Sequence, residues 1–240
     1  MILPLQDRVI LVTGAAKRIG RVIARRLARE GARVAIHYST SEAEARDTAA
    51  ECGHAPIFRA DLEKVSEIET LFAAVEQRMG HIDGLVNNAA RFTGIDPLKI
   101  TETDWDYIHS VNLKATFFCC QQAARRMLAS GGGRIVNISS LGALRAWPEH
   151  AHYCASKAGV VMLTRALSEA FAPHISVNSV APGVIPFGEQ DQRIRHLIAK
   201  TPAGRAGTPE EVAEAVLFFL TASQFITGQL IAVDGGLSQK

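Results

Sequence analysis

The stretch Arg8–Gly20 reads Arg-Val-Ile-Leu-Val-Thr-Gly-Ala-Ala-Lys-Arg-Ile-Gly, and it decides the fold. Its first half is a continuous apolar run, which is typical of a strand that a parallel sheet buries on both faces. Glycines then let the backbone turn tightly into a helix, whose first N–H groups and dipole attract phosphate. Because doubly wound folds accept dinucleotides at this junction, the stretch predicts a nucleotide-binding α/β protein.

Further β-rich runs alternate with helical patterns along the rest of the chain. Two helix starts are marked, since Ser41-x-x-Glu44 predicts a capping box and Thr208 precedes a proline at the first helical position. The alternation predicts α/β architecture, with one doubly wound parallel sheet of about seven strands and helices on both faces, in one domain spanning residues 1–240. The expected strands are Arg8–Thr13, Arg33–Tyr38, Ile57–Arg59, Gly84–Asn87, Arg134–Ser139, Ser176–Ala181 and Leu230–Val233.

Composition excludes several classes of protein. Hydrophobic residues make up 48% of the 240 residues, but no apolar run approaches the ~20 residues that cross a bilayer. The net charge is only +2, which gives no reason to expect a nucleic-acid or membrane partner. The four cysteines form no CxxC pair and the eight histidines have no metal-ligand spacing. We expect a cytoplasmic protein without a structural metal, acting on a small molecule.

The end of the second strand should distinguish NAD from NADP, because an acidic residue there binds the free ribose hydroxyl and repels a 2′-phosphate. No carboxylate occurs there before Glu42, whereas hydroxyl and basic side chains are present. The sequence therefore predicts NADP(H). The residues expected to bind it in this half of the site are Gly14, Lys17, Arg18, Ile19, Gly20, Tyr38, Ser39, Thr40 and Ser41.

Tyr153 and Lys157 are four residues apart in Tyr-Cys-Ala-Ser-Lys, so a helix would place them on one face. A nearby cation favours the phenolate and should lower the pKa of Tyr153 from ~10 toward neutrality. Such a phenol can act as a general acid, a role typically worth about 10²–10⁴ in rate.

Several separated motifs together resemble the short-chain dehydrogenase/reductase family over essentially the whole chain. They are Thr13-Gly14 with Gly20, Asn87-Asn88-Ala89-Ala90, Ser140 with Tyr153 and Lys157, Pro182-Gly183, and Val233-Asp234-Gly235-Gly236. The resemblance implies a Rossmann-type fold that transfers hydride reversibly between a nicotinamide and a carbonyl or imine. It also implies a homotetramer.

The resemblance assigns roles to individual residues. Tyr153 would exchange the substrate proton, and Lys157 would lower its pKa and hold the nicotinamide ribose. Ser140, thirteen residues before the tyrosine, would bind the substrate oxygen in preference to Ser139, and Asn112 would position a water that leads protons to Lys157. Further cofactor contacts are implied at Asp61, Leu62, Asn88, Ala89, Ala90, Pro182, Gly183 and Ile185.

The chain departs from the family pattern in two places. Arg18 replaces the middle glycine of the turn, and Pro186 replaces a threonine expected near the nicotinamide carboxamide. Arg18 also resembles the pteridine reductase branch, in which such an arginine lies near cofactor phosphate and pterin. Phe92 matches that branch's pterin-stacking aromatic. The expected function is therefore pteridine reduction with NADPH, with Arg18, Phe92, Ser140 and Tyr153 at the substrate.

Two alternatives remain open. Ser140 is the ordinary serine of carbonyl reductases, whereas trypanosomatid pteridine reductases have aspartate, so a 3-oxoacyl-[acyl-carrier-protein] reductase or another ketone reductase is the first alternative. The second is a nucleotide-binding sensor without catalysis, a class that commonly loses the tyrosine or lysine kept here. The irregular segment at about 184–207 is expected to cover the substrate.

Overall fold

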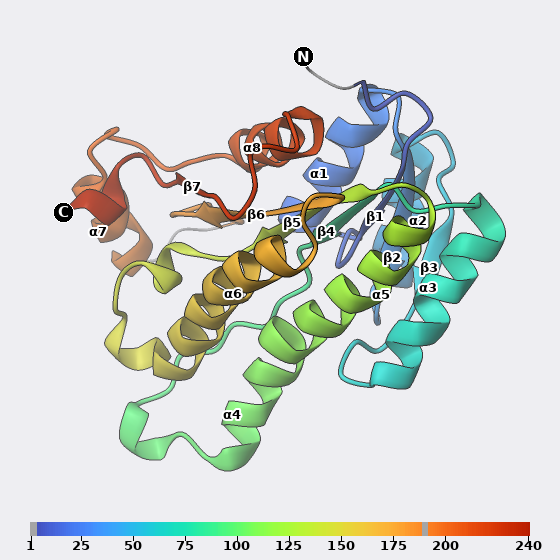
Figure 1. The fold of residues 1–240 in the computed structure, drawn as a ribbon. Coiled ribbons are helices and arrows are strands. Elements are labelled where there is room, and N and C mark those ends of the chain that lie inside the picture. The colour runs from blue at the N-terminus through green and yellow to red at the C-terminus, as the bar shows by residue number, and fades with distance from the viewer. Residues whose placement is uncertain (1–3, 189–191) are drawn as a thin grey trace.

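The computed structural model describes residues 4–188 and 192–240, and its seven described strands form one parallel sheet (Figure 1). The strand order is β3-β2-β1-β4-β5-β6-β7, so the winding direction reverses between β1 and β4, where doubly wound sheets open a crevice for ligands. The predicted fold class is confirmed. The strands are β1 (Val9–Val12), β2 (Arg33–Tyr38), β3 (Ile57–Arg59), β4 (Gly84–Asn87), β5 (Gly133–Ile138), β6 (Ile175–Pro182) and β7 (Leu230–Val233).

Helices cover both faces of the sheet, with α1 and α8 on one side and α5 and α6 on the other (Figure 1). β1 is buried along its whole length, and its alternate side chains enter the two cores: Ile10 and Val12 face α1, whereas Val9 and Leu11 face α3 and α5. The helices are α1 (Arg18–Arg29), α2 (Glu42–Glu51), α3 (Val65–Met79), α4 (Glu102–His109), α5 (Thr116–Ala129), α6 (Ala151–Ala170), α7 (Gln192–Lys200) and α8 (Pro209–Thr221).

The helix start predicted at Thr208 is confirmed, and it carries a capping box. Thr208 accepts a hydrogen bond from the Glu211 N–H, and the Glu211 carboxylate accepts the Thr208 N–H in return. The box predicted at Ser41 is wrong, because the Ser41 side chain makes no capping bond. Its backbone, at φ −89° and ψ 64°, is outside the extended region in which an N-cap oxygen reaches the next turn.

A buried polar chain crosses the sheet beneath the crevice. The Asn87 side-chain amide on β4 donates to the Asn137 side-chain oxygen, Oδ1, on β5 at 2.9 Å. The Asn137 side-chain Nδ2 donates in turn to the Thr164 hydroxyl on α6 at 3.0 Å. All three residues are buried, so each depends on the others for its hydrogen bonds. We refer to this chain as the Asn87–Asn137–Thr164 network.

Candidate active site

The turn between β1 and α1 is shaped for close approach of a ligand. Gly14 has a positive φ of 62°, and a Cβ on Gly20 would overlap the Gly14 carbonyl oxygen. The Asn88 side chain donates to the carbonyl oxygens of Thr13 and Gly14 at 3.0 and 3.1 Å. The Thr13 hydroxyl in turn accepts from the backbone N–H groups of Asn88 and Ala89. The first and fourth strand ends are thereby tied into one rigid cradle.

His37 completes this cradle, and sequence reasoning gave it no role there. Its Nδ1 accepts the Gly14 N–H at 3.1 Å, and its Nε2 lies 3.1 Å from the Ala60 carbonyl oxygen. These partners require the neutral ring with its proton on Nε2. Burial lowers the pKa of His37 from 6.5 to about 4, so the ring stays neutral at physiological pH. A histidine inside a predicted buried strand was the sequence feature that could have revealed it.

A cavity of about 410 Å³ opens beside the cradle at the point where the strand order reverses. This position and the glycine turn fit a dinucleotide. The cavity gathers every predicted cofactor residue of the first four strand ends. They are Gly14, Lys17, Arg18, Ile19, Gly20, Tyr38, Ser39, Thr40, Ser41, Asp61, Leu62, Asn88, Ala89 and Ala90.

Positive charge surrounds the end of β2. Arg18 has a φ of 54°, so it keeps the left-handed backbone for which the family uses glycine and adds an exposed guanidinium. Glu42, the first carboxylate after the strand, is paired with Arg46. Arg59 on β3, which sequence reasoning missed, donates from Nε to the Ser39 carbonyl oxygen at 3.3 Å. This edge can therefore hold an additional phosphate.

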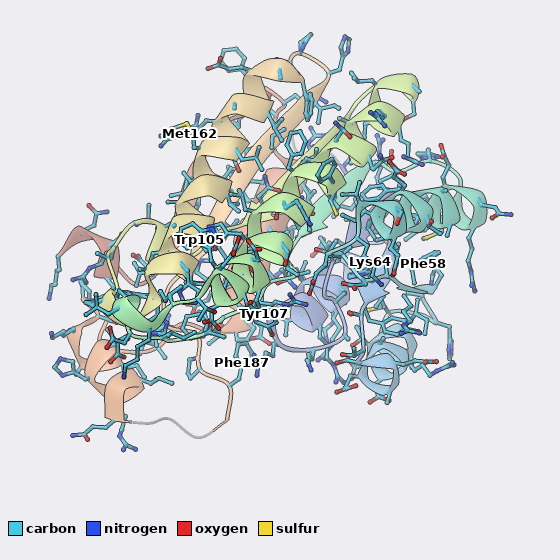
Figure 2. The ribbon with its side chains drawn as sticks, turned by 90° about the horizontal axis from the view of Figure 1, so that it is seen from below. Phe58, Lys64, Trp105, Tyr107, Met162 and Phe187 are labelled. Carbon is cyan, nitrogen blue, oxygen red and sulfur yellow. The ribbon has the colours of Figure 1, made fainter. Side chains whose placement is uncertain are left out.

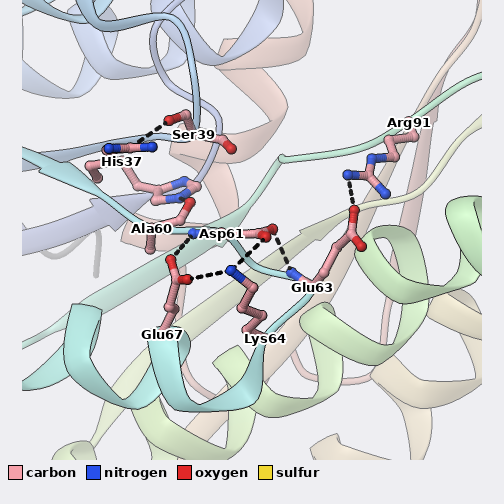
Figure 3. A network of polar contacts seen from close by, with 9 residues as sticks. His37, Ser39, Ala60, Asp61, Glu63, Lys64, Glu67 and Arg91 are labelled. Atoms are coloured by element: carbon pink, nitrogen blue, oxygen red, sulfur yellow. Dashed lines mark hydrogen bonds and ion pairs between the residues drawn. The ribbon is translucent and has the colours of Figure 1, made fainter.

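A polar network closes the far end of the cavity (Figure 3). The Asp61 carboxylate accepts the Glu63 N–H at 3.1 Å, and Glu63 forms an ion pair with Arg91 from the segment after β4. The Arg91 guanidinium also lies 4.1 Å from the centre of the Tyr107 ring on α4. Figure 2 shows Tyr107 and Lys64 among the side chains of this face. Arg91 was not predicted, because only the preceding Asn-Asn-Ala-Ala is a motif.

Ser140, Tyr153 and Lys157 meet at the carboxyl end of β5. The Ser140 side chain lies close enough to Tyr153 to affect the pKa of its hydroxyl, and the Ser140 Oγ accepts the Gly142 N–H at 3.1 Å. Ser139 faces the other way and donates to the Val180 carbonyl oxygen at 3.2 Å, as the alternation of side chains requires. Lys157 is buried and donates from Nζ to the Ile138 carbonyl oxygen at 2.9 Å. The geometry thus brings a phenol, a hydroxyl and an ammonium together.

The expected lowering of the Tyr153 pKa is not found. Burial raises the pKa of Tyr153 to about 12, although the hydrogen bond from Ser140 opposes the rise. Burial also lowers the pKa of Lys157 to about 8, and the ammonium lies 6.0 Å from the phenol ring centre. Desolvation therefore outweighs the attraction that the four-residue spacing suggested.

Asn112 lies in a π-helical segment, Ser110–Ala115, between α4 and α5. Its side chain holds both backbone groups of Arg91, accepting the N–H at 2.8 Å and donating to the carbonyl at 3.0 Å. It also donates to the Ser156 hydroxyl at 3.1 Å, one residue from Lys157. Asn112 thereby joins the cofactor end of the site to helix α6.

The predicted substrate segment begins directly after β6. The Gly183 N–H donates to the Val233 carbonyl oxygen at 2.9 Å, and a Cβ on Gly183 would lie 2.6 Å from the Asp234 Cα, so Pro182 and Gly183 sit tightly against β7. Ile185 packs against Gly207, and the Phe187 ring lies 5.8 Å from the Arg18 guanidinium (Figure 2). Residues 189–191 of this segment lie outside the described residues.

Phe92 contacts Tyr153 directly. Its ring meets Tyr153 edge to face, with 4.7 Å between ring centres, and 58% of the residue remains exposed. The four residues predicted at the substrate are therefore divided. Phe92, Ser140 and Tyr153 come together, whereas Arg18 lies in the nucleotide cavity and reaches toward Phe187.

Comparison with known proteins agrees with this geometry. Residues 14–238 match the family model described as enoyl-(acyl carrier protein) reductase. In the described ranges, no helix is both long and apolar enough to span a bilayer.

Individual relatives match over nearly their whole length. The chain is 34% identical to a 3-oxoacyl-[acyl-carrier-protein] reductase from a Synechocystis species, covering 97% of this chain and 98% of that protein. It is 38% identical to (2S)-[(R)-hydroxy(phenyl)methyl]succinyl-CoA dehydrogenase subunit BbsD from Thauera aromatica, with 98% of each chain covered. A gluconate 5-dehydrogenase from Burkholderia cenocepacia, solved with NADP and tartrate, superimposes with a TM-score of 0.92 at 33% identity and covers 98% and 97% of the two chains.

None of these names refers to a pteridine, so the expected pteridine reductase branch has no support among them. Their names share oxidoreductase chemistry, and the Burkholderia structure contains NADP. The chain belongs to the short-chain dehydrogenase/reductase family.

Proposed function

We propose that this oxidoreductase uses NADP(H) to interconvert a ketone and its alcohol, with Tyr153 as the proton donor in reduction. One observation carries the proposal: the side chains of Ser140, Tyr153 and the buried Lys157 come together at the carboxyl end of β5, in a sheet whose switch-point cavity fits a dinucleotide. The Burkholderia relative, named as a gluconate 5-dehydrogenase in complex with NADP, supports the same reaction class.

The residues divide the reaction between them. A bound dihydronicotinamide supplies the hydride. Ser140 orients the substrate oxygen toward the Tyr153 hydroxyl, which donates its proton to that oxygen. Lys157, with a pKa of about 8, is mostly protonated at neutral pH and gives the phenolate a fixed positive charge nearby. Asn112 holds the backbone of Arg91 and the helix that carries the tyrosine in one arrangement.

NADP(H) is favoured over NAD(H) by the charges at the end of β2. Lys17 and Arg18 line the same cavity as Ser39 to Ser41, and Arg59 bonds to the Ser39 carbonyl oxygen. The first carboxylate after the strand, Glu42, is already paired with Arg46. A 2′-phosphate would meet cations and hydroxyls there rather than an acidic side chain.

The assembly is proposed to be a cytoplasmic homotetramer, and the substrate a small molecule rather than a nucleic acid or membrane component. Exposed apolar side chains on α4 and α5, namely Trp105, Phe117 and Leu128, support burial of these helices against another copy. Trp105 is labelled in Figure 2.

Pteridine reduction is the second candidate, and the observation that favours it is the exposed Phe92 ring beside Tyr153. A flat heteroaromatic could stack there. Ser140 and the names of the relatives favour a carbonyl instead.

An initial-rate screen tests the proposal. NADPH or NADH would be offered with 3-oxoacyl thioesters, keto acids, aromatic ketones, quinones, dihydrobiopterin and dihydrofolate. We expect NADPH to be consumed with at least one carbonyl compound and faster than NADH. Consumption with dihydropterins alone would establish the second candidate, whereas tight NADPH binding without any turnover would make the protein a sensor.

A further inference from the structure

Four aromatic rings gather at the reacting hydroxyl, and together they form what we call the aromatic corner: Phe92, Trp147, His150 and Tyr153. Phe92 and His150 stack with 4.6 Å between ring centres and 22° between planes. Trp147 and Tyr153 are nearly parallel, with 6.2 Å between centres and 6° between planes. Apart from Tyr153, these rings lie outside the hydride-transfer machinery described above.

The two pairs stand at right angles to each other. Phe92 makes an angle of 89° with both Trp147 and Tyr153, at centre distances of 6.4 and 4.7 Å. A flat ring placed in such a corner stacks on one wall and presents its edge to the other. Both arrangements are the favourable ones for aromatic pairs, worth more than the apolar area alone. A saturated ring of the same size gains only the free energy of burying its apolar surface.

The walls are held in place by their own contacts. His150 Nδ1 bonds to the Thr93 carbonyl oxygen at 2.9 Å, and the absence of a side chain on Gly94 leaves room for the imidazole, since a Cβ there would lie 2.6 Å from it. Gly142 packs against both Trp147 and Tyr153, so a Cβ would lie 3.4 Å from one ring and 3.2 Å from the other. The corner is therefore preorganised.

The corner is also open to a ligand. Phe92 is 58% exposed even though its ring contacts Tyr153, which is itself buried. The Phe92 and Trp147 ring centres lie 4.7 and 6.2 Å from the centre of the Tyr153 ring, so a substituent on a carbon held at Tyr153 can reach them. Covering the exposed phenyl face adds a hydrophobic gain to the ring contacts.

We propose that the substrate carries an aromatic ring on its reacting carbon, as in an aryl ketone or the corresponding benzylic alcohol, and that this ring occupies the aromatic corner. The inference rests on the proposed ketone reductase function and names its substrate class. In reduction, the carbonyl carbon gains a hydride and its oxygen gains the Tyr153 proton. The C=O π bond becomes a C–H and an O–H bond, NADPH becomes NADP⁺, and solvent returns the proton to Tyr153.

The test compares acetophenone with cyclohexyl methyl ketone, which differ in the planarity of one ring. kcat/KM with NADPH would be measured for both ketones in the wild-type protein and in Phe92→Leu, Trp147→Leu and Phe225→Leu. Phe225 is the control, because it is 97% exposed and follows α8, near the start of β6 and away from the site. We then divide kcat/KM for acetophenone by kcat/KM for cyclohexyl methyl ketone in each protein. The difference in intrinsic reactivity between the two ketones is the same in every variant, so it cancels when these ratios are compared. Unfolding temperature and NADPH affinity verify that each variant is folded.

We expect the ratio for aromatic over saturated ketone to fall about tenfold in Phe92→Leu and in Trp147→Leu and to stay unchanged in Phe225→Leu. An unchanged ratio in both corner variants would overturn the inference while leaving the ketone reductase function intact. So would turnover of other carbonyls with neither of these ketones reduced. If no carbonyl of any kind is reduced, the proposed function itself fails and this inference fails with it.

Discussion

The two ends of the site are built differently. At the nucleotide end, backbone atoms form most of the surface. Gly14 and Gly20 leave the turn free of side chains. Asn88 and His37 hold the turn with hydrogen bonds to main-chain atoms. At the substrate end, side chains make the surface, and rings from two other segments, Phe92 after β4 and Trp147 before α6, contact Tyr153. A backbone-built site tolerates few residue types at fixed spacing, whereas a side-chain-built site can change its ligand without altering the frame.

The largest expected effect is that of substituting Tyr153, where the nucleotide end and the substrate end meet, on the catalytic rate. We expect Tyr153→Phe to lower kcat by about 10²–10⁴, the usual contribution of a general acid, and to leave NADPH affinity nearly unchanged. Turnover under saturating NADPH and fluorescence titration of NADPH separate the two quantities. If turnover stays within a few-fold of the wild type, another group donates the proton and the catalytic centre lies elsewhere.

The second effect concerns the stability of the nucleotide end. Burial lowers the pKa of His37 from 6.5 to about 4, so the folded protein binds this proton less tightly than the unfolded chain. The contribution of His37 to stability is therefore complete above about pH 6.5 and declines as the pH falls through 4. Its size is about 3 kcal/mol at ~1.4 kcal/mol per pKa unit. Denaturant unfolding at several pH values measures it.

His37→Gln removes the titrating group, so the variant should lose less free energy of unfolding than the wild type between pH 6.5 and 4. The matched control is His174→Gln, since His174 is exposed and its side chain has no role in the site. Parallel pH curves for wild type and His37→Gln would show that the ring is not held neutral in the fold.

The third effect sharpens the cofactor preference. Arg18 has a left-handed backbone, so Arg18→Gly removes the guanidinium and relieves the backbone strain, whereas Arg18→Ala removes the guanidinium and keeps that strain. We expect Arg18→Gly to weaken NADPH about tenfold relative to NADH, the lower range for a hydrogen bond to a charged group. Dissociation constants for both nucleotides give the ratio. Equal weakening of the two would assign the 2′-phosphate to Lys17 or Arg59 instead.

The smallest effect distinguishes a formed cap from one that only the sequence suggests. Thr208→Ala removes a capping bond and should lower the free energy of unfolding by about 1 kcal/mol. Ser41→Ala removes a hydroxyl that makes no cap and should change stability by less than about 0.5 kcal/mol. Thermal unfolding of the two variants compares them directly, and equal losses would mean that the Ser41 cap forms in solution.

Sequence reasoning located the seven strands well, because buried parallel strands are continuous apolar runs and the helices between them have clear starts. It also located the nucleotide turn and the meeting of Ser140, Tyr153 and Lys157, because short motifs encode these backbone positions. Sequence reasoning failed for the property that depends on burial, the pKa of Tyr153. The Tyr153 pKa depends on desolvation, which the spacing to Lys157 does not encode.

Long-range contacts explain the other misses. His37 reaches Gly14 and Ala60 across neighbouring strands, and Arg91 reaches Glu63 from the next strand end. Each is an ordinary polar residue in the sequence, and only the strand order brings its partner near. Trp147 and His150 differ, because their position between Ser140 and Tyr153 in the sequence already makes them candidates for the pocket lining. Only their contact with Phe92, more than fifty positions earlier, depends on the fold.

The Asn87–Asn137–Thr164 network has a consequence for how this sequence can vary. Replacing one of these amides with an aliphatic side chain would leave its buried neighbours without hydrogen-bond partners and lower the stability of the fold. Replacing the partners together could leave the stability nearly unchanged. We therefore expect joint substitutions at these positions to keep the protein stable and single substitutions to destabilise it. For the same reason, we expect β4, which leads to Asn88, and α6, which carries Tyr153, to change together at these positions.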